Sequence, residues 1–130
     1  MQGELLEADR VGSILDAFYA VYNYYGHGLS EAVYAGALEH ELRDRGHTVV
    51  RELMVSIYYH GRFVARQRLD MVVDNRIIVE NKATEKLVQA NRMQLVGYLK
   101  ATSFVVGLLL HFGPSPHTER LVDYPKRTAR

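Results

Sequence analysis

The side chains of this sequence best placed to do chemistry are Asp70, Glu80 and Lys82. They lie around the triplet Asp74-Asn75-Arg76, whose residue types favour a tight turn, and an apolar run stands on each side of it. The pattern predicts an antiparallel β-hairpin centred on Asn75. In that register Asp70 faces Glu80 with about 5 Å between Cβ atoms, and Lys82 returns to the same face two residues later.

Two like charges opposed across a strand pair destabilise it, so this arrangement needs compensation. A divalent cation would provide it, because Mg²⁺ favours carboxylate oxygens and retains waters that can meet a phosphate. Lys82 could then hold or deprotonate an attacking water, or neutralise charge that develops on the phosphate. The alternative is a structural network in which Lys82 and Arg68 neutralise the two acids. The spacing alone leaves both interpretations open.

A stripe of arginines leads toward the same carboxylates. Arg62, Arg66 and Arg68 share the parity of one strand face with Asp70, which predicts that their guanidinium groups line the approach to it. Arginine forks match the geometry of phosphate oxygens, so the stripe is a candidate nucleic-acid contact. The alternative is a solvated edge, or ion pairing with Glu52 and nearby acids.

The composition is that of an ordinary globular protein. With 130 residues, 48% of them hydrophobic and 24% charged, the chain suits one domain with one core, expected at 1–124, and a basic tail at 125–130. The absence of cysteine excludes disulfides, cysteine-ligated zinc and iron–sulfur clusters. A net charge of +1 does not by itself indicate nucleic acid. Without a membrane span or a secretory signal pattern, the chain is expected in the cytoplasm.

The first half of the chain reads as two helices. Apolar residues at spacings of three and four predict a helix from Val11 to Tyr25, followed by a glycine turn at 26–28. Ser30 can cap a second helix that carries Glu31 in its first turn and ends before Gly46. A carboxylate in that place is favoured by the helix dipole whatever its role. The expected apolar face of the second helix comprises Val33, Tyr34, Ala37, Leu38 and Leu42. Tyr34 is expected to pack the helix on the sheet, and the alternative is a hydrogen bond to Glu31.

Strands are expected next. Alternation predicts a half-buried strand from Val49 to Tyr58, then a turn at His60-Gly61 and a strand that reaches the hairpin at 74–76. The predicted apolar face of that second strand comprises Phe63, Ala65, Leu69 and Met71. A third strand is expected at Ile77–Asn81.

The last part of the chain predicts a helix and two strands. Thr84 is expected to cap a helix that runs from Glu85 to about Lys100. The unbroken apolar run Phe104–Leu110 predicts a strand covered on both faces, in the middle of the sheet and reached by a helical crossover. An edge strand is expected at Leu121–Tyr124.

These motifs resemble a known family. Asp70 followed by Glu80, Asn81 and Lys82 is similar to the D…(D/E)xK signature of the PD-(D/E)XK nuclease superfamily. The glycine, glutamate and tyrosine of GLSEAVY, at Gly28, Glu31 and Tyr34, resemble the motif of the GxxExxY group placed in that superfamily. The later blocks QLVGYLKAT and VGLLLHFG are also similar to that group.

The resemblance implies an α/β fold with a restriction-endonuclease-like core: a mixed sheet with an antiparallel three-strand meander, flanked by helices. It implies a Mg²⁺-dependent nuclease, with Mn²⁺ as a substitute, that hydrolyses phosphodiester bonds in DNA more than in RNA. Asp70, Glu80, the backbone carbonyl of Asn81 and Glu31 would hold the metal, and Lys82 would act on the water. Gln94 and Tyr98 resemble the QxxxY element that supports the metal site or the substrate strand in RecB-like members.

One residue departs from the family pattern. Asn81 stands where an apolar residue is common, and its side chain is expected to face away from the carboxylates. The same fold can also serve as a non-catalytic nucleic-acid-binding or protein-interaction module, which is the alternative function. A homodimer or a protein partner is the expected source of specificity, because so short a chain leaves little room for a separate recognition domain.

Overall fold

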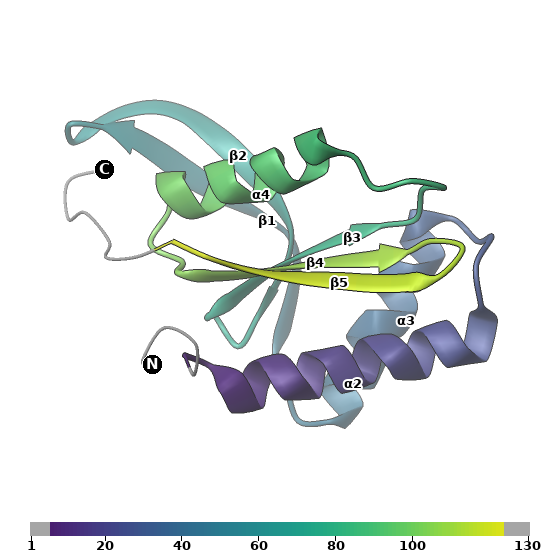
Figure 1. The fold of residues 1–130 in the computed structure, drawn as a ribbon. Coiled ribbons are helices and arrows are strands. Elements are labelled where there is room, and N and C mark those ends of the chain that lie inside the picture. The colour runs from purple at the N-terminus through teal and green to yellow at the C-terminus, as the bar shows by residue number, and fades with distance from the viewer. Residues whose placement is uncertain (1–5, 124–130) are drawn as a thin grey trace.

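A computed structural model of the protein describes residues 6–123, so the expected edge residue Tyr124 and the tail at 125–130 lie outside the described residues. Five strands form one sheet in the order β1-β2-β3-β4-β5 (Figure 1). The elements are α2 Ala8–Tyr25, α3 Glu31–Asp44, β1 Val49–Tyr59, β2 Arg62–Val73, β3 Ile77–Lys82, α4 Gln89–Ala101, β4 Val106–Phe112 and β5 Pro116–Val122. None of the described helices combines the length and the apolar character needed to cross a membrane.

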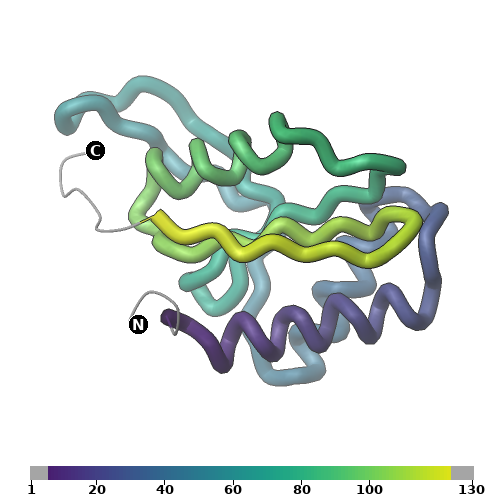
Figure 2. The backbone as a smooth tube through the Cα atoms, in the orientation of Figure 1, coloured from purple at the N-terminus to yellow at the C-terminus, as the bar shows by residue number. Residues whose placement is uncertain are grey.

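Helices cover both faces of the sheet. Figures 1 and 2 show α2 and α3 on one side and α4 on the other. The α2–α3 side holds the larger apolar cluster, which includes Phe18, Tyr34, Met71, Leu108 and Phe112. The α4 side holds a smaller one, formed by Leu69, Val72, Ile78, Leu95, Leu99 and Leu109. The central strands contribute to both clusters because successive residues point to opposite faces.

The topology confirms the expected α/β architecture. β1, β2 and β3 form an antiparallel meander, α4 crosses over to β4, and β4 pairs parallel with β3. Every residue of β4 is buried, as its unbroken apolar run predicts. The β2–β3 hairpin has the predicted register, with Met71 opposite Val79 and Val73 opposite Ile77. Its turn carries the positive φ angles that tight hairpins require, 54° at Asp74 and 53° at Asn75.

Several predicted element boundaries differ from the structure: α2 begins at Ala8 rather than Val11, β4 is Val106–Phe112 rather than Phe104–Leu110, and the starts of α4 and β5 are displaced further. The helix expected at Glu85 begins at Gln89, because the Thr84 hydroxyl donates to the Lys86 carbonyl (2.8 Å) within a bend instead of capping a helix. β5 begins at Pro116 rather than Leu121, and Pro116 pairs with Phe112. A proline is compatible with the first position of an edge strand, so the turn between β4 and β5 is shorter than the sequence suggests.

Some residues expected in the core are exposed. Val33 is 41% exposed on α3, and Phe63 is 58% exposed near the tip of the β1–β2 hairpin. Ala65 is exposed as well. β1 and β2 continue well past the point where β3 stops pairing with β2, so the outer part of this hairpin has no neighbouring strand on the β3 side (Figure 1). Alternating apolar residues there do not reach the core.

The β2–β3 turn is tied to the helical layer through Asp74. Its carboxylate accepts hydrogen bonds from the Thr48 N–H (2.8 Å) and from Arg10 Nε (2.8 Å), and it pairs with His47 Nδ1 (2.7 Å). Partial burial raises the pKa of Asp74, but the bonds from His47, Thr48 and Arg10 outweigh burial and hold this pKa at about 2. The turn that sets the β2–β3 register is thereby fixed to α2.

We expect Asp74→Asn to lower the free energy of unfolding at pH 7 by about 2 kcal/mol, since its pKa lies below the ordinary value of 3.8. The stabilisation from the ionised group is complete above about pH 4 and is lost as the pH falls toward 2. Urea unfolding at a series of pH values measures the difference. Asp44→Asn, at an exposed position of α3, is the control and should cause no comparable loss. Equal stability of Asp74→Asn and the wild type at pH 7 would contradict this assignment.

Candidate active site

The candidate site lies where β2 and β3 separate. Their backbone pairing ends at Met71 and Val79. Beyond it the Asp70 N–H donates to Glu80 Oε2 (3.1 Å), and the Asn81 N–H donates to Asp70 Oδ2 (3.1 Å). Side chains therefore replace the strand carbonyls as acceptors, and Asp70 and Glu80 are held next to each other as the sequence predicts.

The pairing of β1 with β2 is interrupted at the same level. Arg51 pairs with Met71 and Leu53 with Leu69, but Glu52, between them, has a left-handed φ of 54°. Met71 belongs to the α2–α3 cluster, whereas Leu69 belongs to the α4 cluster. Residues of equal parity thus change faces across this point, which can happen only if the regular alternation breaks. The break places Asp70 and Glu52 in an open pocket rather than in either core.

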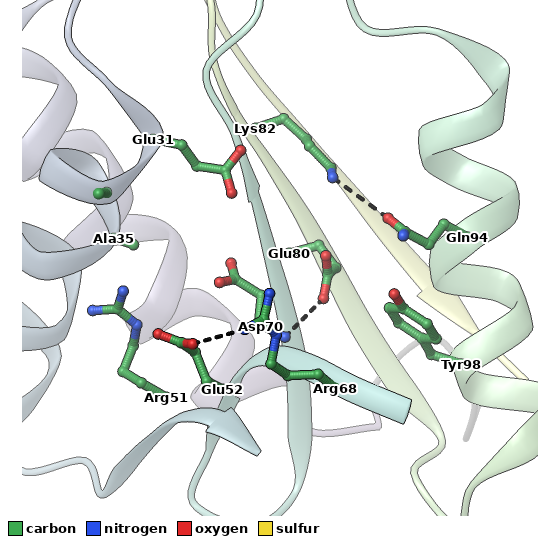
Figure 3. Close-up of a pocket in the computed structure, with 11 residues that line it drawn as sticks. Glu31, Ala35, Arg51, Glu52, Arg68, Asp70, Glu80, Lys82, Gln94 and Tyr98 are labelled. Atoms are coloured by element: carbon green, nitrogen blue, oxygen red, sulfur yellow. Dashed lines mark hydrogen bonds and ion pairs between the residues drawn. The ribbon is translucent and has the colours of Figure 1, made fainter. Parts of the chain in front are cut away.

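The pocket has a volume of about 330 Å³ and opens between α3 and α4 (Figure 3). The six residues predicted as catalytic, Glu31, Asp70, Glu80, Lys82, Gln94 and Tyr98, all line it, and so does Arg68 of the predicted arginine stripe. The remaining lining residues are Arg51, Glu52, Ala32 and Ala35. Asn81 does not line the pocket with these residues but contacts Asp70 from behind. Residues distant in sequence therefore converge on one space.

Glu31 is positioned by the turn that precedes α3. Gly28 has a φ of 122°, which residues other than glycine rarely adopt. The Ser30 side chain accepts from the Val33 N–H and caps the helix. The Tyr34 hydroxyl donates to the Gly26 carbonyl (2.5 Å) and accepts from the Leu29 N–H (3.2 Å). The glycine turn, the Ser30 cap and the Tyr34 hydroxyl therefore fix the start of α3, whose first turn carries Glu31 into the pocket.

Tyr34 itself has a packing role, as expected. It is fully buried, and its ring stacks on Phe112 of β4 with centroids 4.3 Å apart and an interplanar angle of 12°. Its hydroxyl bonds the loop and not Glu31.

Glu80 is the most electrostatically perturbed group of the pocket. Only 5% of it is exposed, and burial raises the pKa of its carboxyl to about 7, opposed by the Asp70 N–H bond and reinforced by the Asp70 charge. Partial burial also raises the pKa of Glu31, with the Lys82 ammonium lowering it and Asp70 raising it. The cluster is therefore short of positive charge.

The amide of Asn81 contradicts the prediction that this side chain faces away from the carboxylates. Asn81 is fully buried, and its Nδ2 donates to Asp70 Oδ2 (2.9 Å), the oxygen that its backbone N–H also contacts. Its Oδ1 is buried and accepts no hydrogen bond. The amide reaches across because β2 and β3 have already separated here. Asp70 Oδ2 is held by two donors, which leaves Oδ1 toward the pocket.

One wall of the pocket, across from Glu31, is formed by Lys82, Gln94 and Tyr98 (Figure 3). Lys82 Nζ donates to Gln94 Oε1 (3.4 Å; Figure 3). The Tyr98 hydroxyl accepts from Gln67 Nε2 (3.3 Å). Burial raises the pKa of Tyr98, and the charges of Glu80 and Asp70 add to the increase. One turn of α4 separates Gln94 from Tyr98, so both reach the pocket from the same helix face.

The arginine stripe is only partly as predicted. Arg68 lines the pocket, where its Nη1 bonds Glu52 Oε1 (3.0 Å), and Arg66 lies farther out on the same strand. A register shift at Ile57 and Tyr58 sets Phe63 opposite Tyr58 and Arg62 opposite Tyr59. Because directly opposed residues share a face, the bulge moves Arg62 to the other face and puts Phe63 on the arginine face.

The ion-pair interpretation of the cluster does not fit these contacts. Arg68 pairs with Glu52, Lys82 bonds to Gln94, and within residues 6–123 neither Asp70 nor Glu80 forms an ion pair within 4.0 Å. No three His, Asp or Glu side chains of the described range stand close enough together to hold a metal ion on their own. The donor chemistry nevertheless fits a hard cation, since a buried carboxylate, a free carboxylate oxygen and waters are ligands of the kind that Mg²⁺ takes.

Sequence reasoning did not single out Arg51, Ala32 or Ala35 of the pocket. It named Glu52 as the alternative ion-pair partner of the arginine stripe, and the Arg68–Glu52 pair confirms this for Arg68. The turn at His60-Gly61 alone would set Glu52 opposite Leu69. Only the register shift at Ile57 and Tyr58 brings Glu52 level with Asp70, so no local signal in the sequence would have found it.

We expect the free energy of unfolding of the metal-free protein to fall as the pH rises from about 4.5 to 7, because the folded state holds the Glu80 proton more tightly than the unfolded chain does. The ionisation costs about 3 kcal/mol in total. Glu80→Gln removes that cost, so in EDTA it should be more stable than the wild type at pH 8 and similar at pH 4.

Urea unfolding at the two pH values measures this difference. Asp16→Asn, at an exposed position of α2, serves as the control and should show no such pH dependence relative to the wild type. A Glu80→Gln variant that is less stable than the wild type at pH 8 would contradict the assignment.

Comparisons with known proteins bear on the fold and the family of the chain. The crystal structure of SSO0001 is similar, with a TM-score of 0.57 and 19% identical residues over 92% of this chain and 61% of that one. At this identity the likeness shows the fold alone, and this chain spans only about three fifths of that protein. No curated protein matches the chain.

A family model provides the identification. The model of the PD-(D/E)XK nuclease superfamily matches residues 8–122, which are nearly all of the residues that the structure describes. The match includes every pocket residue, and the mixed sheet flanked by helices confirms the expected restriction-endonuclease-like fold. The chain belongs to the PD-(D/E)XK nuclease superfamily.

Proposed function

We propose that the protein is a Mg²⁺-dependent nuclease that hydrolyses phosphodiester bonds, in DNA rather than RNA, with Mn²⁺ as a substitute metal. One observation carries the proposal: buried Glu80 lies next to Asp70, neither carboxylate forms an ion pair with any residue at 6–123, and the same pocket holds Lys82. Burying a carboxylate without an opposite charge destabilises the folded protein. A cation bound in this open pocket, where a phosphate can also enter, would offset that destabilisation.

Asp70 and Glu80 would hold the metal, together with the backbone carbonyl of Asn81 and with Glu31. The free Oδ1 of Asp70 is turned to the pocket because Oδ2 is engaged by the two Asn81 donors. Glu31 lies on the α3 side of the pocket, where the charges of both Asp70 and Lys82 affect its pKa. A divalent cation bound there supplies Lewis-acid stabilisation of the charge on the transferring phosphate.

Lys82 is the proposed group that acts on the water. Its ammonium lies in the pocket beside Glu80, where it can orient the attacking water, accept its proton in the neutral form, or neutralise the developing charge. Gln94 restrains Lys82 through its Oε1 and Tyr98 borders Glu80, so both would support the site rather than react. Arg66 and Arg68 are the proposed phosphate contacts; Arg62 is not, since it lies on the other hairpin face.

Within the superfamily we assign the chain to the GxxExxY group, on the unit formed by Gly28, Glu31 and Tyr34. We further propose that it works inside the cell and that a second copy or a protein partner contributes to specificity.

We expect Mn²⁺ or Mg²⁺ titrated into the wild type to give a calorimetric binding signal, and Asp70→Asn to lose it together with cleavage. The wild type should also gain about 3 kcal/mol of stability at a metal concentration of about 100 times Kd, and Asp70→Asn should gain none. Asp44→Asn is the matched control. Absence of binding to the wild type would favour the non-catalytic module instead.

Lys82→Ala should abolish cleavage of single- and double-stranded DNA while it leaves the affinity for Mn²⁺ largely intact, because the ammonium acts on the water and not as a ligand. Lys100→Ala, on the exposed side of α4, is the control for loss of a positive charge. Cleavage by Lys82→Ala at the wild-type rate would remove Lys82 from the mechanism.

A further inference from the structure

The β1–β2 hairpin presents an exposed strip that is continuous with the pocket. Residues directly opposite each other in a hairpin share a face. The pairs on this face are Arg68 with Met54, Arg66 with Ser56, and Phe63 with Tyr58. Arg68 already lines the pocket beside Asp70. We call this face the hairpin strip; it comprises Met54, Ser56, Tyr58, Phe63, Arg66 and Arg68. From Asp70 to Phe63 it extends about 20 Å.

The strip exposes large apolar groups that a strand face in water normally avoids. Met54 is 49% exposed, Tyr58 48% and Phe63 58%. The rings of Tyr58 and Phe63 meet edge to face with centroids 6.2 Å apart. The opposite face of the hairpin behaves differently near its base, where Leu53 and Val55 pack against the α4 cluster. Only the strip face lacks a covering element along its whole length within the described part of the chain.

The strip is also positively charged. From Leu53 to Gln67 the chain contains no aspartate or glutamate. Arg66 forms no ion pair with any described residue, and the pair between Arg68 and Glu52 is exposed on both sides, so it is weak and exchangeable. An anionic occupant would therefore meet two guanidinium groups that lead from the hairpin tip to the pocket.

We infer that the hairpin strip binds an unpaired segment of a nucleic-acid strand and directs it into the pocket. Arg66 and Arg68 contact its phosphates, and Tyr58 and Phe63 stack on its bases. An unpaired segment is specified because only unstacked bases can present their faces to exposed aromatic rings, whereas a duplex offers its phosphates and groove edges. This inference rests on the proposed function for the identity of the ligand but not on catalysis.

The test is binding of a fluorescently labelled oligothymidylate to the full chain in EDTA, so that no cleavage occurs. The wild type should bind the single strand at least tenfold more tightly than a duplex of equal length. Tyr58→Ala with Phe63→Ala should weaken single-strand binding about tenfold or more. Arg66→Gln should reduce the slope of log K against log salt by about 0.7.

The hairpin supplies its own control. Tyr59 and Arg62 oppose each other on the other face, one residue pair nearer the tip than Tyr58 and Phe63, so Tyr59→Ala with Arg62→Gln removes one ring and one guanidinium group from that face. This variant should bind nearly as the wild type does. Tyr58→Phe, which keeps the ring, should also retain binding, and melting curves verify that each variant is folded.

The outcomes separate this inference from the proposed function. Equal loss in the two hairpin-face variants, or equal affinity for duplex and single strand, overturns the inference even if the protein cleaves DNA with metal. Tight single-strand binding through the strip supports it even if no cleavage is found. Light scattering that shows a dimer dissociated by the Tyr58 and Phe63 substitutions would assign the strip to a second copy and likewise overturn it.

Discussion

The separation of β2 from β3 beyond Met71 and Val79 is the constraint on which the site depends. As long as two strands pair, their backbone groups satisfy each other and leave no room between them. Once they separate, those groups need other partners, and the carboxylates of Asp70 and Glu80 take that role. The hydrogen bonds that satisfy the last backbone N–H groups of the two strands therefore also hold Asp70 and Glu80 in place. Their position follows from the need to pair these N–H groups and not from side-chain packing alone.

Rigid elements on both sides keep this opening in place. The Tyr34 ring stacks on Phe112 of the interior strand β4, and its hydroxyl holds the loop before α3. The position of Glu31, in the first turn of α3, is therefore fixed relative to β4. At the other end of the β2–β3 hairpin, Asp74 ties the turn to Thr48 and to Arg10 of α2. A shift of the β2–β3 turn away from α2 would have to break the Asp74 contacts. The site is therefore supported by preorganised neighbours on each wall.

Local patterns predicted most of the fold and half of the site geometry. The hairpin register, the start of α3 at Ser30 and the buried strand β4 all follow from turn chemistry, capping and apolar runs that are complete within a few residues. The errors have another origin. The left-handed φ of Glu52, the bulge that exposes Phe63 and the reach of the Asn81 amide to Asp70 each depend on contacts between distant segments. Single-residue irregularities of this kind leave no periodic signal in the sequence.

Those irregularities share a location, which argues that they belong to function rather than to imperfect packing. Glu52 carries backbone strain, Asn81 leaves a buried oxygen without a donor, and Glu80 is buried at a raised pKa, all within one sheet opening. An apolar pair at positions 70 and 80 would close the sheet at lower cost. Both apolar clusters form without Glu52, Glu80 and Asn81. The packing of the fold therefore does not depend on the residues that are unfavourable at the site. Local instability beside two well-packed cores is the pattern expected when a binding site, and not the fold, has determined the residue types.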